Sequence, residues 1–396
     1  MRRALDESTT ADRMMLDSPV PAGAKKTDKA LPASGAEQPS RLAGVIPSLD
    51  GLRAVSILIV FLAHTGLRGI VPGFFGVTVF FFLSGYLITT LLRNEFETSS
   101  NIGLRSFYLR RAFRIWPLFY LVLIVATLLS AFGAYGPPLP LDPGLVFMQF
   151  AHLANYAIVH SGWVLGRGAG TWVYWSLAVE EHFYLVLPLV YLAMLKAGVR
   201  SRRQAAIFLT LCLATLVWRL ALVFVFDAPK ERMYVATDTR IDSILFGCVL
   251  AVVYNPVLDP PPCREGWLKY VWFPLGAVLI VLSFLPRQSW FDQTLRYTLQ
   301  GVALLPIFLV AVRYPRWLPC RALNHPWVRM LGALSYAIYL AHTVVIGLVE
   351  RWIKSPIALT LVSGVATLVA AWVLHRTIEQ PFIRLRRHLA RSSGKI

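Results

Sequence analysis

The chain has 396 residues, of which 56% are hydrophobic and only 15% are charged, and its formal net charge is +18. Soluble domains carry about 25% charged residues, so this composition excludes a large soluble protein and indicates an integral membrane protein. The four cysteines show no paired spacing, which predicts neither a disulfide framework nor a zinc site.

The chain begins with a polar segment and continues with repeated apolar segments. Residues 1–47 are rich in Ala, Ser, Pro, Lys and Asp and lack periodicity, so we expect a disordered tail. Residues 48–386 contain apolar stretches long enough to cross a bilayer, and residues 387–396 form a basic C-terminal tail. We therefore expect an all-α polytopic membrane protein with about ten transmembrane helices, near residues 51–68, 73–92, 110–132, 172–195, 204–226, 240–256, 270–286, 298–313, 331–350 and 356–376. The weaker stretch 144–160 is typical of a re-entrant or surface helix.

The positions of the basic residues predict the orientation of the chain. If the N-terminal tail is cytoplasmic and all ten segments cross, most of the 39 Lys and Arg residues lie on the cytoplasmic side, as the positive-inside rule requires. We expect a multi-pass protein in contact with the lipid of a bacterial-type inner membrane, with both termini cytoplasmic. The same rule accounts for most of the net charge, so nucleic-acid binding is not indicated.

The first apolar segment carries a cation and an imidazole on one face. Arg53 and His64 are eleven residues apart, so a helix separates them by about 16.5 Å along its axis. An ionisable residue inside a span is costly to bury and indicates a functional site. The pair predicts a ligand that is long, anionic at one end and reactive at the other. Without the family motif described below, a topology anchor that reaches the headgroups explains Arg53 equally well.

Polar residues of the outer half form the first predicted cluster. With this orientation, His64 and Glu180 both lie in the outer half of their spans. Arg240 or Asp242, at the start of the sixth span, is expected to join them. Ser176 lies four residues before Glu180 and therefore on the same helix face, although a helix-start role explains it as well.

Cations form the second predicted cluster, at the inner face. Arg53, Arg111 and Arg114 lie near the cytoplasmic ends of their spans. Arginine binds phosphate groups through bidentate contacts, but Arg111 and Arg114 serve equally as positive-inside signals. His342 lies at mid-depth in the ninth span, where a histidine is more often packed or hydrogen-bonded than a second base.

The two clusters suit two parts of one reaction. A neutral imidazole can take a proton from a hydroxyl as that oxygen attacks a carbonyl, and an unperturbed pKa of about 6.5 suits this role at neutral pH. A carboxylate such as Glu180 can orient the imidazole and stabilise its charged form, as in a catalytic triad. The combination predicts a phosphate-bearing acyl donor that enters from the cytoplasm with its thioester directed toward His64.

Five segments in order along the chain carry a resemblance to a known family. They are the Arg53-x10-His64 pair, GFFGVTVFFFLSGYLIT at 73–89, FYLRRAFRIWP at 107–117, WSLAVEEHFY at 175–184, and LSYAIYLAHT at 334–343 together with IEQPF at 378–382. Over residues 47–386 the chain resembles acyltransferase family 3, integral membrane proteins that O-acylate polysaccharides, lipid-linked sugars and peptidoglycan. The resemblance implies that residues 48–386 form an acyltransferase-3 type bundle.

The resemblance also implies roles for individual residues. The family histidine that matches His64 acts as the catalytic base, and acyl-CoA is the donor. The family arginines that match Arg53, Arg111 and Arg114 are implicated in function, with donor binding as the expected role. Thr78 departs from the pattern, because many members have Asp at this position. The outer polar network of this chain therefore lacks one carboxylate.

The sequence as a whole predicts an O-acyltransferase, with acetyl as the expected group and acetyl-CoA as the donor substrate. We expect His64 to deprotonate a hydroxyl of a carbohydrate or glycolipid acceptor, with Glu180 assisting and without a metal. The residues alone leave two other classes open. A transporter or flippase of a glycolipid or polysaccharide unit uses buried charges equally well, and a non-catalytic scaffold tolerates their loss.

Overall fold

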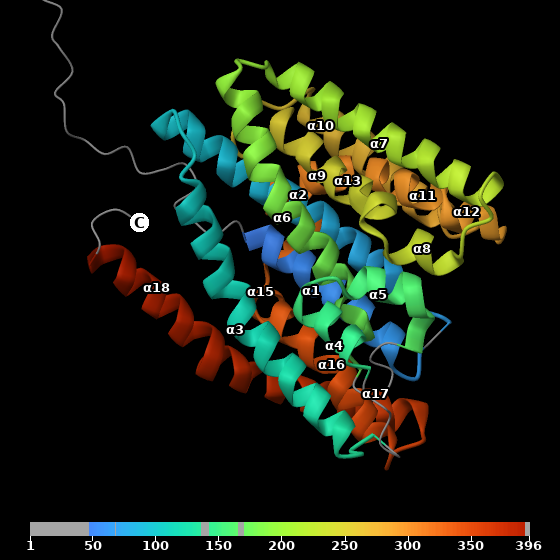
Figure 1. Ribbon diagram of the computed structural model, residues 1–396. Helices are drawn as coiled ribbons and strands as arrows, with labels where there is room; N and C mark the ends of the chain where they lie inside the picture. The colour runs from blue at the N-terminus through green and yellow to red at the C-terminus, as the bar shows by residue number, and fades with distance from the viewer. Residues whose placement is uncertain (1–46, 68, 136–141, 165–169, 393–396) are drawn as a thin grey trace, which may run out of the picture. The chain divides into compact units, whose positions relative to one another are not determined.

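The computed structural model describes residues 47–67, 69–135, 142–164 and 170–392, so the tail expected over 1–47 lies almost wholly outside the described residues. The described chain is helical and contains no β-strand, which confirms the all-α class. In chain order the elements are α1 (Pro47–His64), α2 (Gly73–Ser99), α3 (Leu104–Ala131), α4 (Pro143–Phe150), α5 (Ala154–Ser161), η1 (Gly162–Val164), η2 (Thr171–Tyr174), α6 (Trp175–Lys196), α7 (Ser201–Phe224), α8 (Lys230–Val235), α9 (Thr237–Val252), α10 (Glu265–Trp267), η3 (Leu268–Trp272), α11 (Phe273–Leu282), α12 (Ser289–Gln293), α13 (Leu295–Arg313), α14 (Leu318–Arg321), η4 (Ala322–Asn324), α15 (Pro326–Ala333), α16 (Ser335–Glu350), α17 (Pro356–Leu374), η5 (His375–Glu379) and α18 (Gln380–Ser392) (Figure 1).

The number of helices able to span a membrane is lower than expected. Among the described residues, seven helices are long and apolar enough, or eight if the bent pair α15 and α16 counts as one span. The expected count of about ten is therefore too high, although all ten expected segments are helical. Helix α9 has only 16 residues and is buried by its neighbours along most of its length. Its apolar composition thus reflects packing against other helices, which hydropathy does not distinguish from contact with lipid.

The weak stretch 144–160 is not expected to span the membrane, and it forms two short helices, α4 and α5, that are not counted among the candidate spans. The C-terminal boundary differs from the expected one. Helix α18 continues to Ser392, so most of the segment expected as a C-terminal tail is helical.

The centre of the bundle depends on a close approach of α2 and α9. A Cβ atom on Gly85 would lie 1.9 Å from the carbonyl oxygen of Ile244, and one on Gly247 would lie 2.0 Å from that of Phe82. Only glycine fits at these positions, as at small-residue contacts between membrane helices. The contact fixes α2 against the buried helix α9 and so determines where its polar residues lie.

A sharp bend shapes the C-terminal side of the bundle. Helices α15 and α16 meet at an angle of 68°, with Leu334 between them. Helix α1 packs against α2, α15 and α16, while α16 also contacts α3 and α17. Helix α18 runs along α3 (Figure 1). This arrangement brings one face each of α1, α3, α6 and α16 around a common space.

Candidate active site

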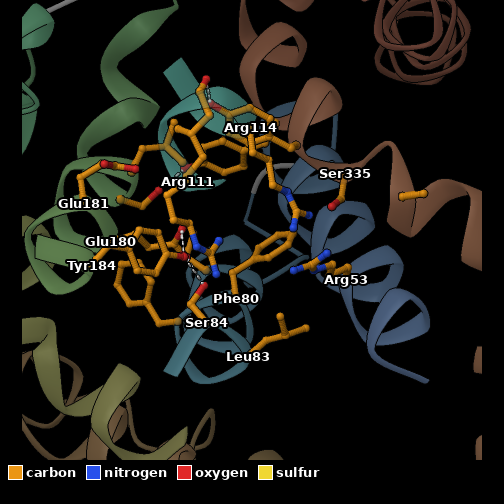
Figure 2. A pocket seen from close by; sticks show the side chains of 18 residues that line it. Arg53, Phe80, Leu83, Ser84, Arg111, Arg114, Glu180, Glu181, Tyr184 and Ser335 are labelled. Atoms are coloured by element: carbon orange, nitrogen blue, oxygen red, sulfur yellow. Dashed lines mark hydrogen bonds between the residues drawn. The ribbon is translucent and has the colours of Figure 1, made fainter. Parts of the chain in front are cut away.

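Three arginines from two helices converge on one cavity. The cavity has a volume of about 90 Å³ and is lined by Arg53 of α1 and by Arg111 and Arg114 of α3; we call it the arginine cavity. Glu180 of α6 lines the same cavity (Figure 2), and so does Ser176 of α6. The arginines that the sequence analysis grouped at the inner face therefore lie together, but with two residues expected in the other cluster.

Glu180 is held by hydroxyl groups and faces the arginines. The Ser84 hydroxyl donates to its Oε1 at 2.8 Å, and the Tyr184 hydroxyl donates to its Oε2 at 3.2 Å (Figure 2). The guanidinium of Arg111 lies 4.6 Å from the centre of the Tyr184 ring. From the sequence, we expect Glu180 to orient His64. The structure instead places Glu180 in the arginine cavity, where its carboxylate offsets the cationic charge.

His64 is held by a second histidine. Nε2 of His342 lies 3.1 Å from Nδ1 of His64, and the indole of Trp172 packs edge-on at 4.9 Å between ring centres. Nδ1 of His342 lies 2.7 Å from the carbonyl oxygen of Tyr339. A carbonyl only accepts, so this Nδ1 carries the proton and Nε2 accepts from Nδ1–H of His64. The hydrogen bonds thus select the His64 tautomer whose lone pair is on Nε2, as a base requires.

Tyr339 and Ser176 lie between the arginine cavity and the histidine pair. Both line the cavity, and the ring centre of Tyr339 is 5.6 Å from that of His342. The Tyr339 hydroxyl donates to the carbonyl oxygen of Val173 at 2.7 Å, so the Ser176 hydroxyl donates to Tyr339 at 2.6 Å. His64 does not line the cavity in this state. A ligand that reaches His64 from the arginines must displace this pair.

Arg240 and Asp242 belong to the packing around α9. Asp242 accepts a 2.6 Å hydrogen bond from Arg219 of α7, and both side chains are fully buried. Arg240 donates to the Thr78 hydroxyl at 3.2 Å and lies 3.9 Å from the centre of the Tyr297 ring. Neither residue lines the arginine cavity, and the partners that hold them are Arg219 for Asp242 and Thr78 for Arg240, so their expected place beside His64 stays a prediction. The ion pair forms because the mid-span Arg219 is costly in lipid and takes Asp242 as its partner.

A second, larger cavity adjoins the first. It has a volume of about 430 Å³ and extends to Arg386 and Arg387 of α18; we call it the α18 cavity. Arg53, Arg114 and Ala333 line both cavities, which therefore meet at these residues. The sequence analysis placed Arg387 in a tail and did not single out Arg386. Helical spacing with Ile383, which lines the same cavity, is the signal that could have found them.

Comparison with known proteins gives a family. A family model described as an acyltransferase domain matches residues 46–376. The chain is similar to peptidoglycan O-acetyltransferase OatA of Listeria monocytogenes, with 29% identity over 354 residues that cover 85% of this chain and 55% of the relative. It is also similar to O-acetyltransferase OatA of Staphylococcus aureus, with 28% identity over 356 residues that cover 85% of this chain and 57% of the relative. The chain thus spans little more than half the length of these relatives, and no solved structure matches it.

Proposed function

The chain belongs to acyltransferase family 3, and on that premise we propose that it is a membrane O-acetyltransferase that takes its acyl group from acetyl-CoA. The family favours an enzyme over the transporter and the scaffold that the residues alone left open. The acceptor we propose is a carbohydrate hydroxyl, since a relative is named for the O-acetylation of peptidoglycan. The proposed orientation has this end of the bundle at the cytoplasm, and the abundance of basic residues near Arg53 and on α18 supports it.

The arginine cavity is the proposed path of the donor. Its volume of about 90 Å³ is too small for a nucleotide, so in this proposal only the narrow arm that carries the thioester enters it, and the cavity widens as the arm enters. Arg53 and His64 lie on the same helix α1, separated by about 16.5 Å along its axis. A donor whose phosphates lie near Arg53 and Arg114 therefore directs its thioester along α1 toward His64. Displacement of Tyr339 from Ser176 opens the last part of this path.

The hydrogen bonds of His64 are the observation that carries the proposal. As the acceptor hydroxyl attacks the thioester carbonyl carbon, its proton passes to Nε2 of His64. The carbon–sulfur bond then breaks, and the leaving thiolate takes that proton from the imidazolium to give CoA. His342 accepts from Nδ1–H of His64 throughout and stabilises the charged ring, in the role that the third member of a triad performs.

Acetyl transfer by the purified chain in nanodiscs tests this proposal. Acetyl-CoA labelled in the acetyl group is supplied with peptidoglycan fragments or other oligosaccharides, and CoA release is compared with label found as ester on the glycan. We expect matched amounts of both. Arg111→Ala should raise KM for acetyl-CoA, whereas Arg105→Ala, an exposed cation of the same helix α3, should leave it unchanged. Glycan flux in liposomes without thioester consumption would contradict the proposal and favour a carrier.

A further inference from the structure

The α18 cavity is strongly cationic and large enough for a ligand. Its volume of about 430 Å³ falls in the range of about 300–1,000 Å³ that is typical of small-molecule sites. Four guanidinium groups line it, those of Arg53, Arg114, Arg386 and Arg387. Empty cavities are apolar, so a cavity with this polar lining holds water or a ligand, and its positive charge favours an anion.

The carboxylates of the α18 cavity do not balance these charges. Asp50 lies 4.0 Å from Arg53, and Glu379 accepts a hydrogen bond of 2.8 Å from Nδ1 of His375. Within the part of the chain that the structure describes, the other three arginines of the cavity form no ion pair. Four cations therefore face two carboxylates, and each carboxylate already has a partner.

The surroundings of Arg386 add to this excess. The charges that act on its guanidinium are those of Arg110, Arg387 and Arg114, all of them cations. Arg386 is also partly buried, where like charges repel more strongly than in water. An arrangement of this kind is stabilised when an anion binds among the cations.

Helix α18 presents two of its arginines to the cavity. Ile383, Arg386 and Arg387 lie at helical spacing and line the cavity, while Phe382 and Leu385 are exposed by 37% and 46%. Arg386 is half-buried and Arg387 is exposed. Both guanidinium groups therefore remain accessible to an anion that enters the cavity.

We propose that Arg386 and Arg387, together with Arg114, bind the phosphate groups of the acyl-CoA donor, an assignment that rests on the proposed function. The planar guanidinium matches two phosphate oxygens at once. Because the two cavities meet at Arg53 and Arg114, phosphates held in the α18 cavity leave the donor arm free to enter the arginine cavity. The phosphate of an anionic lipid headgroup has the same chemistry, so the test must separate the two sources.

The test measures CoA binding to the full chain in nanodiscs of phosphatidylcholine, a lipid without net charge. The variant Arg386→Ala/Arg387→Ala should bind CoA about tenfold or more weakly, because it loses two charge-assisted contacts. The matched control Arg384→Ala removes an exposed cation of the same helix that does not line the cavity, and it should bind as wild type does. Arg386→Lys/Arg387→Lys keeps the charges and should recover part of the affinity.

Three other outcomes would overturn the assignment of Arg386 and Arg387 to the donor phosphates, and each can be told from the others. Equal CoA affinity of wild type and the double alanine variant would refute it and leave the proposed function intact. If the double variant loses bound phosphatidylglycerol but keeps its CoA affinity, the cavity is a lipid-headgroup site. If wild-type protein that transfers no acetyl group also fails to bind CoA, the proposed function itself is wrong. The thermal midpoint of each variant shows whether a loss of binding comes from a loss of folding.

Discussion

Replacement of His342 tests the proposal that its imidazole prepares His64 to act as a base. His342→Phe keeps a planar ring in a fully buried position but removes the nitrogen that accepts from Nδ1–H of His64 at 3.1 Å. A donor that loses its hydrogen-bond acceptor costs up to about 1–3 kcal/mol where it is shielded from water, and His64 is half-buried. Without this hydrogen bond, the productive orientation of His64 and its charged form in the transition state are both destabilised by a similar free energy. At about 1.4 kcal/mol for each factor of ten, kcat should fall about 5- to 150-fold.

The assay is thiol release from acetyl-CoA in the presence of acceptor, at saturating and at limiting donor. KM for acetyl-CoA should change little in His342→Phe, because we propose that the arginines hold the donor, and His342 does not line the arginine cavity. His342→Gln offers an amide oxygen that can accept from His64 and should recover part of kcat. A drop in kcat of equal size in both variants, or a change confined to KM, would refute the reasoning.

Two further substitutions test the packing that positions the site. Gly247→Ala places a Cβ atom 2.0 Å from the Phe82 carbonyl oxygen and should lower the stability of the protein by about 1–3 kcal/mol. The control Gly266→Ala meets no atom within 4 Å and should leave the stability unchanged. Equal thermal midpoints of the two variants would contradict the close approach of α2 and α9. Thr78→Asp should raise the thermal midpoint, because the buried Arg240 gains an anionic partner in place of a hydroxyl at 3.2 Å. A hydrogen bond to a charged group contributes about 1.5–3 kcal/mol. A thermal midpoint below that of wild type would contradict this prediction.

The sequence predicts the helices well because hydropathy determines them directly. All ten expected segments are helical, and the three arginines of the inner cluster lie around one cavity. Their convergence follows from the positive-inside rule, which places cations at one membrane surface whichever helices carry them. The overcount of spans has the same origin, since α9 is apolar for contact with other helices.

The position of Glu180 could not be predicted because depth depends on where helices begin. Helix α1 begins at Pro47 and not near residue 51, and α3 begins at Leu104 and not near 110. Each of these helices therefore starts about one to two turns earlier than expected. Arg53 and Arg111 therefore lie further from the starts of their helices than expected, and they line the same cavity as Glu180.

The contact of His342 with His64 could not be predicted for a different reason. The two residues are 278 positions apart, and the sequence gives no indication of which helices are neighbours. Depth alone placed His342 near the middle of its span. Only the packing of α1 against α16, beside the bend between α15 and α16, brings its imidazole to His64.

The rate of acetyl-CoA cleavage by His64→Ala in nanodiscs, with a glycan acceptor present, tests the central claim most directly. A general base contributes about 10²- to 10⁴-fold, so we predict a loss of this size at an unchanged thermal midpoint. The matched control His160→Ala replaces an exposed histidine of α5 and should cleave acetyl-CoA as wild type does. A folded His64→Ala variant that retains the wild-type rate of acetyl transfer would contradict the account.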